Sequence, residues 1–159
     1  MYCQTLDKII NMNNKIPPPI VTLIFGLTIY FSAPIFPILN NKALDMLSIM
    51  LLILGIATLG LAVYSFKQQK TTVNPIAINK ASSLVINGVF KFSRNPMYLG
   101  MVFFLLAMSA KFNVVGGILI TFLFASFITK FQIIPEERAM MNLFAQDFDE
   151  YKKVTRRWI

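Results

Sequence analysis

The chain has 159 residues, of which 56% are hydrophobic and only 14% charged, and its formal net charge is +8. Soluble domains carry roughly 25% charged residues, so a soluble core could not hide this much apolar surface, whereas a lipid bilayer accepts it. The chain contains no histidine and one cysteine, which excludes an intramolecular disulfide, a catalytic histidine base and metal clusters of the usual His or Cys kind.

Two apolar runs in the first half of the chain are each long enough for a membrane-spanning helix of about 20 residues. The first covers residues 16–39, and Pro34 and Pro37 should kink or end it near its far side. The second covers residues 43–66. Small side chains in it would let a neighbouring helix approach closely, and these are Gly55, Ala57, Gly60 and Ala62.

The second half of the chain predicts a helical hairpin. A polar segment, residues 67–95, precedes it and is expected to fold back into the edge of the bilayer. The apolar run 97–110 is too short to cross the full bilayer alone, whereas the run 112–134 is long enough. Very few residues separate the two runs, so they form antiparallel neighbours.

The residues after Pro135 show the pattern of an amphipathic helix. Met141, Phe144, Phe148 and Tyr151 share one face, and acidic residues occupy the other. Residues 152–158 are basic and aromatic, like an interfacial anchor. The sequence therefore predicts an all-α polytopic membrane protein with about four transmembrane helices, a hairpin and a C-terminal amphipathic helix. It forms one domain, 1–159, made of two N-terminal spans (1–66) and a second half (67–159).

The positive charges predict the orientation of these helices. All 15 Lys and Arg residues except Lys42 and Lys111 fall on the side of the termini and of the segment 67–95. Because basic residues accumulate on the cytoplasmic side, both termini are expected in the cytoplasm. The same distribution explains the net charge as membrane topology and argues against nucleic acid as a partner. Membrane lipids are the expected surroundings.

The predicted spans carry no Asp, Glu, Lys or Arg near their middle. Ion-coupled transporters usually need such a group near the bilayer midplane, so a small four-span transporter is disfavoured. Polar chemistry is gathered instead at one face, in residues 71–100 and around Glu136 and Glu137.

Two segments resemble a known family. Residues 88–100 read GVFKFSRNPMYLG and are similar to the G-x-[YF]-x-x-x-R-[HN]-P-x-Y-x-G signature of the isoprenylcysteine carboxyl methyltransferases. Glu136 and Glu137, with Phe144 and Tyr151 downstream, resemble the second block of that family. The two blocks have the family's spacing and are joined by the same hairpin.

The resemblance implies an integral membrane methyltransferase that uses S-adenosylmethionine and methylates a lipophilic small molecule or a lipidated acceptor. It further implies cofactor binding at the cytoplasmic edge and an inner-membrane location in a bacterium. Asn95 stands where the prenylcysteine enzymes usually have His. Asn95 favours a phospholipid amine as acceptor, as in phosphatidylethanolamine-type N-methyltransferases, whereas residues 72–75 and the ending Arg156-Arg157-Trp158 favour bacterial relatives of the prenylcysteine enzymes. Phospholipid N-methylation is therefore the alternative to methylation of a prenylcysteine-like acceptor. A non-catalytic four-span protein that kept the fold is the other alternative.

The resemblance also assigns candidate site residues. Arg94 and Glu137 are the expected catalytic pair: Arg94 would bind the cofactor carboxylate or an anionic acceptor, and Glu137 would face the cofactor cation. The residues expected to bind cofactor are Asn95, Pro96, Tyr98, Gly100, Glu136 and Glu137, with Pro96 and Gly100 also shaping the backbone. No metal site is expected.

Overall fold

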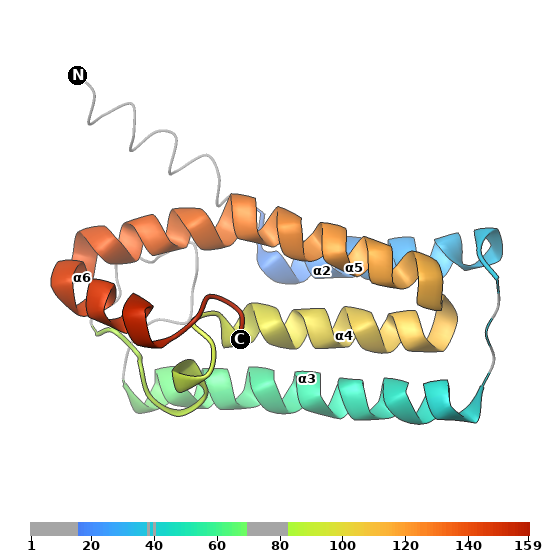
Figure 1. Cartoon of the computed structure of the whole chain (residues 1–159), viewed down its shortest axis with the longest axis horizontal. Coiled ribbons are helices and arrows are strands. Elements are labelled where there is room, and N and C mark those ends of the chain that lie inside the picture. Colours follow the sequence, from blue (N-terminus) through green and yellow to red (C-terminus); the bar gives the residue numbers. More distant parts are fainter. Residues whose placement is uncertain (1–15, 38, 40, 70–82) are drawn as a thin grey trace, which may run out of the picture.

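A computed structural model of the chain describes residues 16–37, 39, 41–69 and 83–159. The expectations for residues 1–15 and for residues 70–82 of the polar segment 67–95 lie outside these ranges. The described helices follow the predicted order (Figure 1): α2 (Pro18–Ser32), α3 (Lys42–Gln68), α4 (Pro96–Phe112), α5 (Val114–Ile128) and α6 (Ile134–Val154). Short turns complete them: η1 (Ala33–Ile35), η3 (Gly88–Lys91) and the π-helical turn η4 (Thr129–Ile133).

Three helical stretches are long and apolar enough to cross a membrane: Pro18–Ile35, Lys42–Gln68 and Val114–Val154. α4 is also apolar but has only 17 residues, which gives a length of about 25 Å. The predicted all-α, polytopic architecture is confirmed, including the short third run. Because α5 and η4 together already match the roughly 30 Å of a bilayer core, α6 continues the same helical stretch beyond the membrane.

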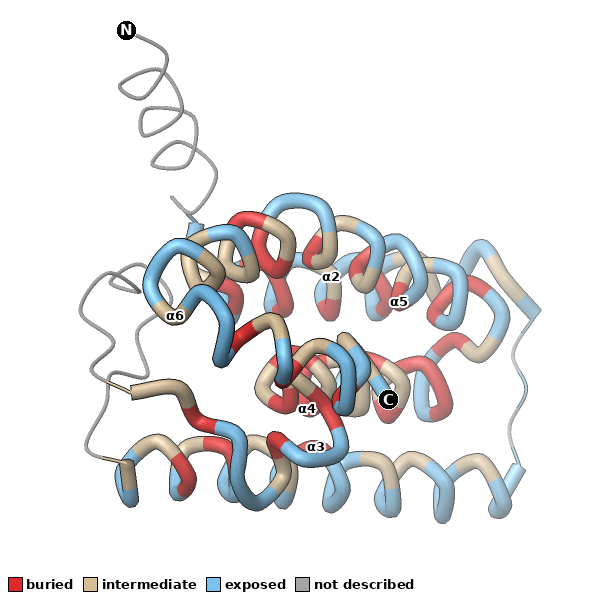
Figure 2. The backbone as a smooth tube through the Cα atoms, turned by 60° about the vertical axis from the view of Figure 1, so that its left-hand side comes forward, coloured by how far each residue is buried: buried red, intermediate tan, exposed pale blue. Residues whose placement is uncertain are grey.

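α4 is the central helix of the bundle. It packs along α3 on one side and against α2 and α5 on the other. The single residue Asn113 joins α4 to α5, and its side chain caps α5 by accepting a hydrogen bond from the Gly116 N–H at 2.9 Å. The predicted hairpin is therefore present with an even tighter connection than expected. Figure 2 shows that exposed residues lie along the outer side of α3, as a lipid-facing helix requires.

Glycines bring α3 and α4 together at one point. A Cβ atom on Gly100 would lie 2.7 Å from Leu59 Cγ and 3.0 Å from the Gly55 carbonyl oxygen. A Cβ on Gly55 would lie 3.0 Å from the Gly100 carbonyl oxygen in turn. Gly55 thus has the close-approach role predicted for it, whereas Gly60 has nothing within 4 Å of its Cβ position.

α6 turns back over one end of the bundle, which we call the motif end because residues 83–95 also lie there (Figure 1). The turn occurs at Ala145, whose φ of 40° and ψ of −109° interrupt the helix. Beyond it, Phe148 and Tyr151 are buried in a cluster with Ala62 and Phe90. The predicted amphipathic helix is confirmed, and its apolar face covers the motif end.

Two of the last residues, Arg157 and Trp158, contact the bundle, whereas Lys153 and Arg156 are exposed. Trp158 packs against the core cluster formed by α2, α4 and α5, and its indole N–H donates to Thr129 Oγ1 at 3.3 Å. The Arg157 side chain turns toward α6.

Candidate active site

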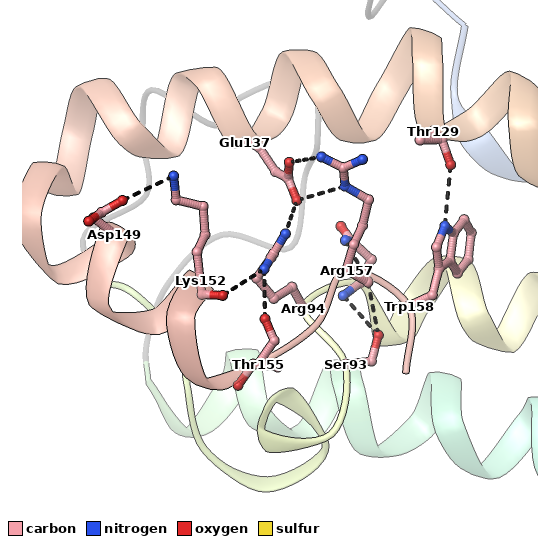
Figure 3. A network of polar contacts seen from close by, with 10 residues as sticks. Ser93, Arg94, Thr129, Glu137, Asp149, Lys152, Thr155, Arg157 and Trp158 are labelled. Carbon is pink, nitrogen blue, oxygen red and sulfur yellow. Dashed lines mark hydrogen bonds and ion pairs between the residues drawn. The ribbon is translucent and has the colours of Figure 1, made fainter.

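The segment Ser93–Pro96 is held at the motif end by the last residues of the chain. The Arg94 N–H donates to the Arg156 carbonyl at 3.0 Å, and Asn95 Nδ2 donates to the Arg157 carbonyl at 3.0 Å. Pro96 then starts α4, where its missing N–H has no helical partner to lose. Segments about sixty residues apart thus form one layer of backbone and side-chain hydrogen bonds (Figure 3).

Glu137 lies between two arginines. Its Oε1 accepts from Arg94 Nη2 at 2.7 Å, and its carboxylate accepts two bonds from Arg157, at 3.1 Å from Nε and 2.6 Å from Nη2. The Arg94 and Glu137 side chains are only 11% and 15% exposed. Such charge-assisted hydrogen bonds are worth about 1.5–3 kcal/mol each, so Glu137 ties residues 93–96 and the C-terminal residues to α6.

These arginines also set the ionisation of Glu137. Burial alone would raise the pKa of the carboxyl, but hydrogen bonds from Arg157 and Arg94 outweigh it and hold the pKa below its ordinary value. One carboxylate facing two guanidinium groups leaves an excess of positive charge. Arg94 Nη1 donates to the Thr155 carbonyl at 2.6 Å, while its buried Nε has no hydrogen-bond partner among the residues that the structure describes. The cluster is therefore suited to receive an anionic group.

A second pair lies beside the first. Tyr98, on the first turn of α4, donates from its hydroxyl to Glu136 Oε1 at 2.5 Å. Burial raises the pKa of Glu136 to about 7, with the Tyr98 hydrogen bond opposing that rise and the neighbouring charge of Glu137 adding to it. The adjacent glutamates thus have opposite pKa shifts, because two arginines outweigh the effect of burial at Glu137 and the Tyr98 hydrogen bond does not at Glu136.

The structure brings most of the predicted site residues together. Arg94, Asn95, Tyr98, Glu136 and Glu137 meet at the motif end through the contacts above. Pro96 is buried at the start of α4, and Gly100 faces α3 at the glycine contact. Pro96 starts a helix and Gly100 allows two helices to approach closely, so both shape the backbone, as expected for them.

Sequence reasoning did not assign Arg157 or Trp158 to the site. Arg157 is the bidentate partner of Glu137, and Trp158 contacts η4. The available signal in the sequence was the basic and aromatic ending Arg156-Arg157-Trp158 directly after the amphipathic helix. Only the reversal of the chain at Ala145 places these residues against Glu137.

An apolar groove of about 600 Å³ opens along α4, α5 and η4. Its lining is almost wholly hydrocarbon, and it includes Trp158 and the start of α6. The lining residues are Leu99, Val102, Phe122, Ala125, Ser126, Thr129, Lys130, Ile134 and Trp158.

The model of one protein family, described as phospholipid methyltransferase, matches residues 44–147. The match covers more than half of the chain and includes both the Ser93–Pro96 segment and the glutamate pair. The chain belongs to the phospholipid methyltransferase family. No curated protein and no solved structure matches the sequence.

The chain is therefore a member of a family of membrane methyltransferases that act on lipid-type substrates. The family shares its superfamily with the isoprenylcysteine carboxyl methyltransferases, so the resemblance seen in the sequence is correct at that broader level. The matched residues stop before Arg157 and Trp158. Those two side chains reach the site from outside the part of the chain that the family model describes.

Proposed function

We propose that this protein transfers a methyl group from S-adenosylmethionine to a lipophilic acceptor at the motif end of the bundle. The observation that carries the proposal is the meeting of the two sequence blocks. Arg94 contacts Glu137, and Tyr98 contacts Glu136, across 43 and 38 residues of chain. The chain belongs to a family of membrane methyltransferases, and its own polar residues converge at one end of an apolar bundle. Both features suit this reaction.

The residues present fit the cofactor at its carboxylate end. Arg94 and Arg157 supply more positive charge than Glu137 neutralises, and Arg94 Nε is a buried donor without a partner in the described part of the chain. Both Nη atoms of Arg94 already donate to Glu137 and to backbone carbonyls, so Nε is the atom that could donate a charge-assisted hydrogen bond to a carboxylate. When bound, the cofactor supplies a methyl group activated by a sulfonium. Arg94 would hold its carboxylate, and Asn95 and Tyr98 would lie nearby.

The role of Glu137 changes in this arrangement. The sequence suggested that its carboxylate faces the cofactor cation, but it is occupied by two guanidinium groups. We propose that Glu137 orients Arg94, and that Glu136 is the carboxyl group free to face a cation. Its single side-chain partner is the Tyr98 hydroxyl among the hydrogen bonds of the described residues.

We propose a phospholipid amine as the acceptor class, ahead of a prenylcysteine carboxylate. An ammonium group must lose a proton before it can attack a methyl group, whereas a carboxylate needs no base. A group with a pKa near 7 is well placed to accept that proton, and the pKa of Glu136 is about 7. The match to the phospholipid methyltransferase family points the same way.

The test uses purified protein in liposomes supplied with S-adenosylmethionine carrying a labelled methyl group. We expect label in phosphatidylethanolamine and little in a farnesylcysteine analogue, and we expect Glu136→Gln to remove the first activity. Label mainly in the prenylcysteine analogue would reassign the acceptor. Absence of cofactor binding by calorimetry in detergent would overturn the proposed function itself.

The acceptor should reach the site from the bilayer. Long-chain and short-chain acceptors with the same head group distinguish this route, because a long chain concentrates the acceptor in the membrane. We expect turnover of the long-chain amphiphile in liposomes and negligible turnover of the water-soluble one. Equal rates at matched aqueous concentration would favour a site open to the aqueous phase.

A further inference from the structure

The apolar groove lies on the part of the bundle that crosses the membrane. Val102 comes from α4 and Phe122 and Ala125 from α5, so hydrocarbon chains of the bilayer surround its open side. Its volume of about 600 Å³ falls within the range of ligand pockets, roughly 300–1,000 Å³. The occupant that fits an almost wholly apolar groove in this position is a hydrocarbon chain.

Three residues that line the groove are close in sequence to residues of the polar site. Leu99 lines the groove and directly follows Tyr98, and Trp158 lines it and directly follows Arg157. Ile134, two residues before Glu136, lines it as well. A chain seated in the groove would therefore bring its head group to the two glutamates. Lys130, which also lines the groove, would pair with a phosphate.

Trp158 is held in place from two directions. Its indole N–H donates to Thr129 Oγ1 on the π-helical turn, and the Arg157 guanidinium is fixed by Glu137 (Figure 3). We propose that Trp158 is a specificity-determining residue whose indole forms the wall shared by the groove and the polar site. This inference rests on the proposed function, because it assumes an acceptor with a hydrocarbon chain. The wall limits the width of the chain that can lie against it.

The first test compares acceptors that differ only in chain shape. Straight and methyl-branched chains of equal length, carrying the same head group, are methylated in liposomes by the parent protein, Trp158→Phe and Trp158→Ala. We expect the parent and Trp158→Phe to prefer the straight chain and Trp158→Ala to lose that preference, since removing the indole makes room for branches. An unchanged ratio in Trp158→Ala would overturn the inference while leaving the proposed function standing.

The second test does not depend on activity. Trp158 is the only tryptophan in the chain, so its fluorescence reports on the groove alone. Nanodiscs are made with phosphatidylcholine whose acyl chains carry bromine, which quenches indole fluorescence on contact. Ala125→Phe fills the groove, whereas Leu123→Phe on the same helix changes an exposed side chain that does not line it.

We expect strong quenching in the parent and in Leu123→Phe, and loss of most of it in Ala125→Phe. Equal quenching in all three proteins would mean that Trp158 meets bulk lipid rather than a chain in the groove, and would overturn the inference. If no acceptor is methylated but the quenching pattern is found, the proposed function fails and chain binding against Trp158 stands.

Discussion

The guanidinium of Arg94 and the carboxylate of Glu137 lie 2.7 Å apart although 43 residues separate them. The intervening chain is the α4–α5 hairpin, which crosses the membrane and returns. This ion pair therefore closes the hairpin at its open end. Because Glu137 also binds Arg157, one carboxylate holds three segments of the chain together.

Replacing Glu137 tests this arrangement. Glu137→Gln removes the negative charge and leaves two guanidinium groups facing each other in a half-buried site. Breaking such a pair by removing one partner costs about 3–5 kcal/mol when fully buried, and less is expected here because Arg157 is 37% exposed. We expect a lower unfolding temperature in detergent and weaker binding of S-adenosylmethionine, measured by calorimetry.

Glu150→Gln is the matched control for that substitution. Glu150 lies on the same helix and its carboxylate accepts a hydrogen bond only from the exposed Gln146, at 3.1 Å, among the described residues. It should leave both measurements unchanged. A Glu137→Gln protein as stable as the parent would contradict the role of this carboxylate as a structural tie.

Glu136 predicts a pH dependence of stability. Its pKa is raised from 4.5 to about 7 in the folded protein, so between these values the folded state keeps a proton that the unfolded state releases. The contribution of Glu136 to the free energy of unfolding is then fully present below about pH 4.5 and is lost as the pH rises through 7. The loss across this window is about 3 kcal/mol, at roughly 1.4 kcal/mol per pKa unit.

Thermal unfolding in detergent between about pH 5 and pH 8 measures this slope. The pKa of Glu137 is lowered, so that group titrates below the window. We expect the unfolding temperature of the parent to fall with rising pH and that of Glu136→Gln to be nearly flat. Parallel profiles for the two proteins would show that Glu136 is not the group responsible.

The glycine contact between α3 and α4 predicts that two Gly→Ala substitutions have different effects on stability. Gly100→Ala would place a methyl group 2.7 Å from Leu59 Cγ, and overpacking of this type costs about 1–3 kcal/mol. Gly60 lies on α3, and a Cβ atom added to it would have nothing within 4 Å. Gly60→Ala should therefore be neutral or slightly stabilising. Unfolding temperatures in detergent measure both, and equal effects would refute close packing at Gly100.

The charge distribution predicts the orientation of the bundle. Lys42, Lys111 and Asp45 lie at the end opposite to the motif end, where Lys111 Nζ contacts Asp45 at 2.7 Å. We expect a cysteine placed at Lys111 to react with a membrane-impermeant reagent in intact cells, and tags on both termini to stay protected. A terminus that can be labelled from outside would contradict the positive-inside assignment.

Local patterns in the sequence were enough to predict the helices. Hydrophobic runs report membrane spans directly, because the bilayer requires about 20 apolar residues whatever the neighbouring helices do. The short run in α4, the hairpin at Asn113 and the amphipathic residues after Pro135 were visible for the same reason. The pairing of the two polar blocks was also predictable, since the hairpin length brings their ends to one face.

The partners of each polar side chain were decided by the tertiary structure alone. Arg157 and Trp158 look like an interfacial anchor in the sequence, and composition does not reveal the reversal at Ala145 that turns them inward. Likewise, Glu136 and Glu137 are identical neighbours in the chain. They acquire opposite pKa shifts because burial raises the pKa of both, and only Glu137 meets two guanidinium groups that outweigh the effect of burial. The pKa of a side chain depends on which groups the fold places within a few ångströms of it, and the order of residues alone does not determine those distances.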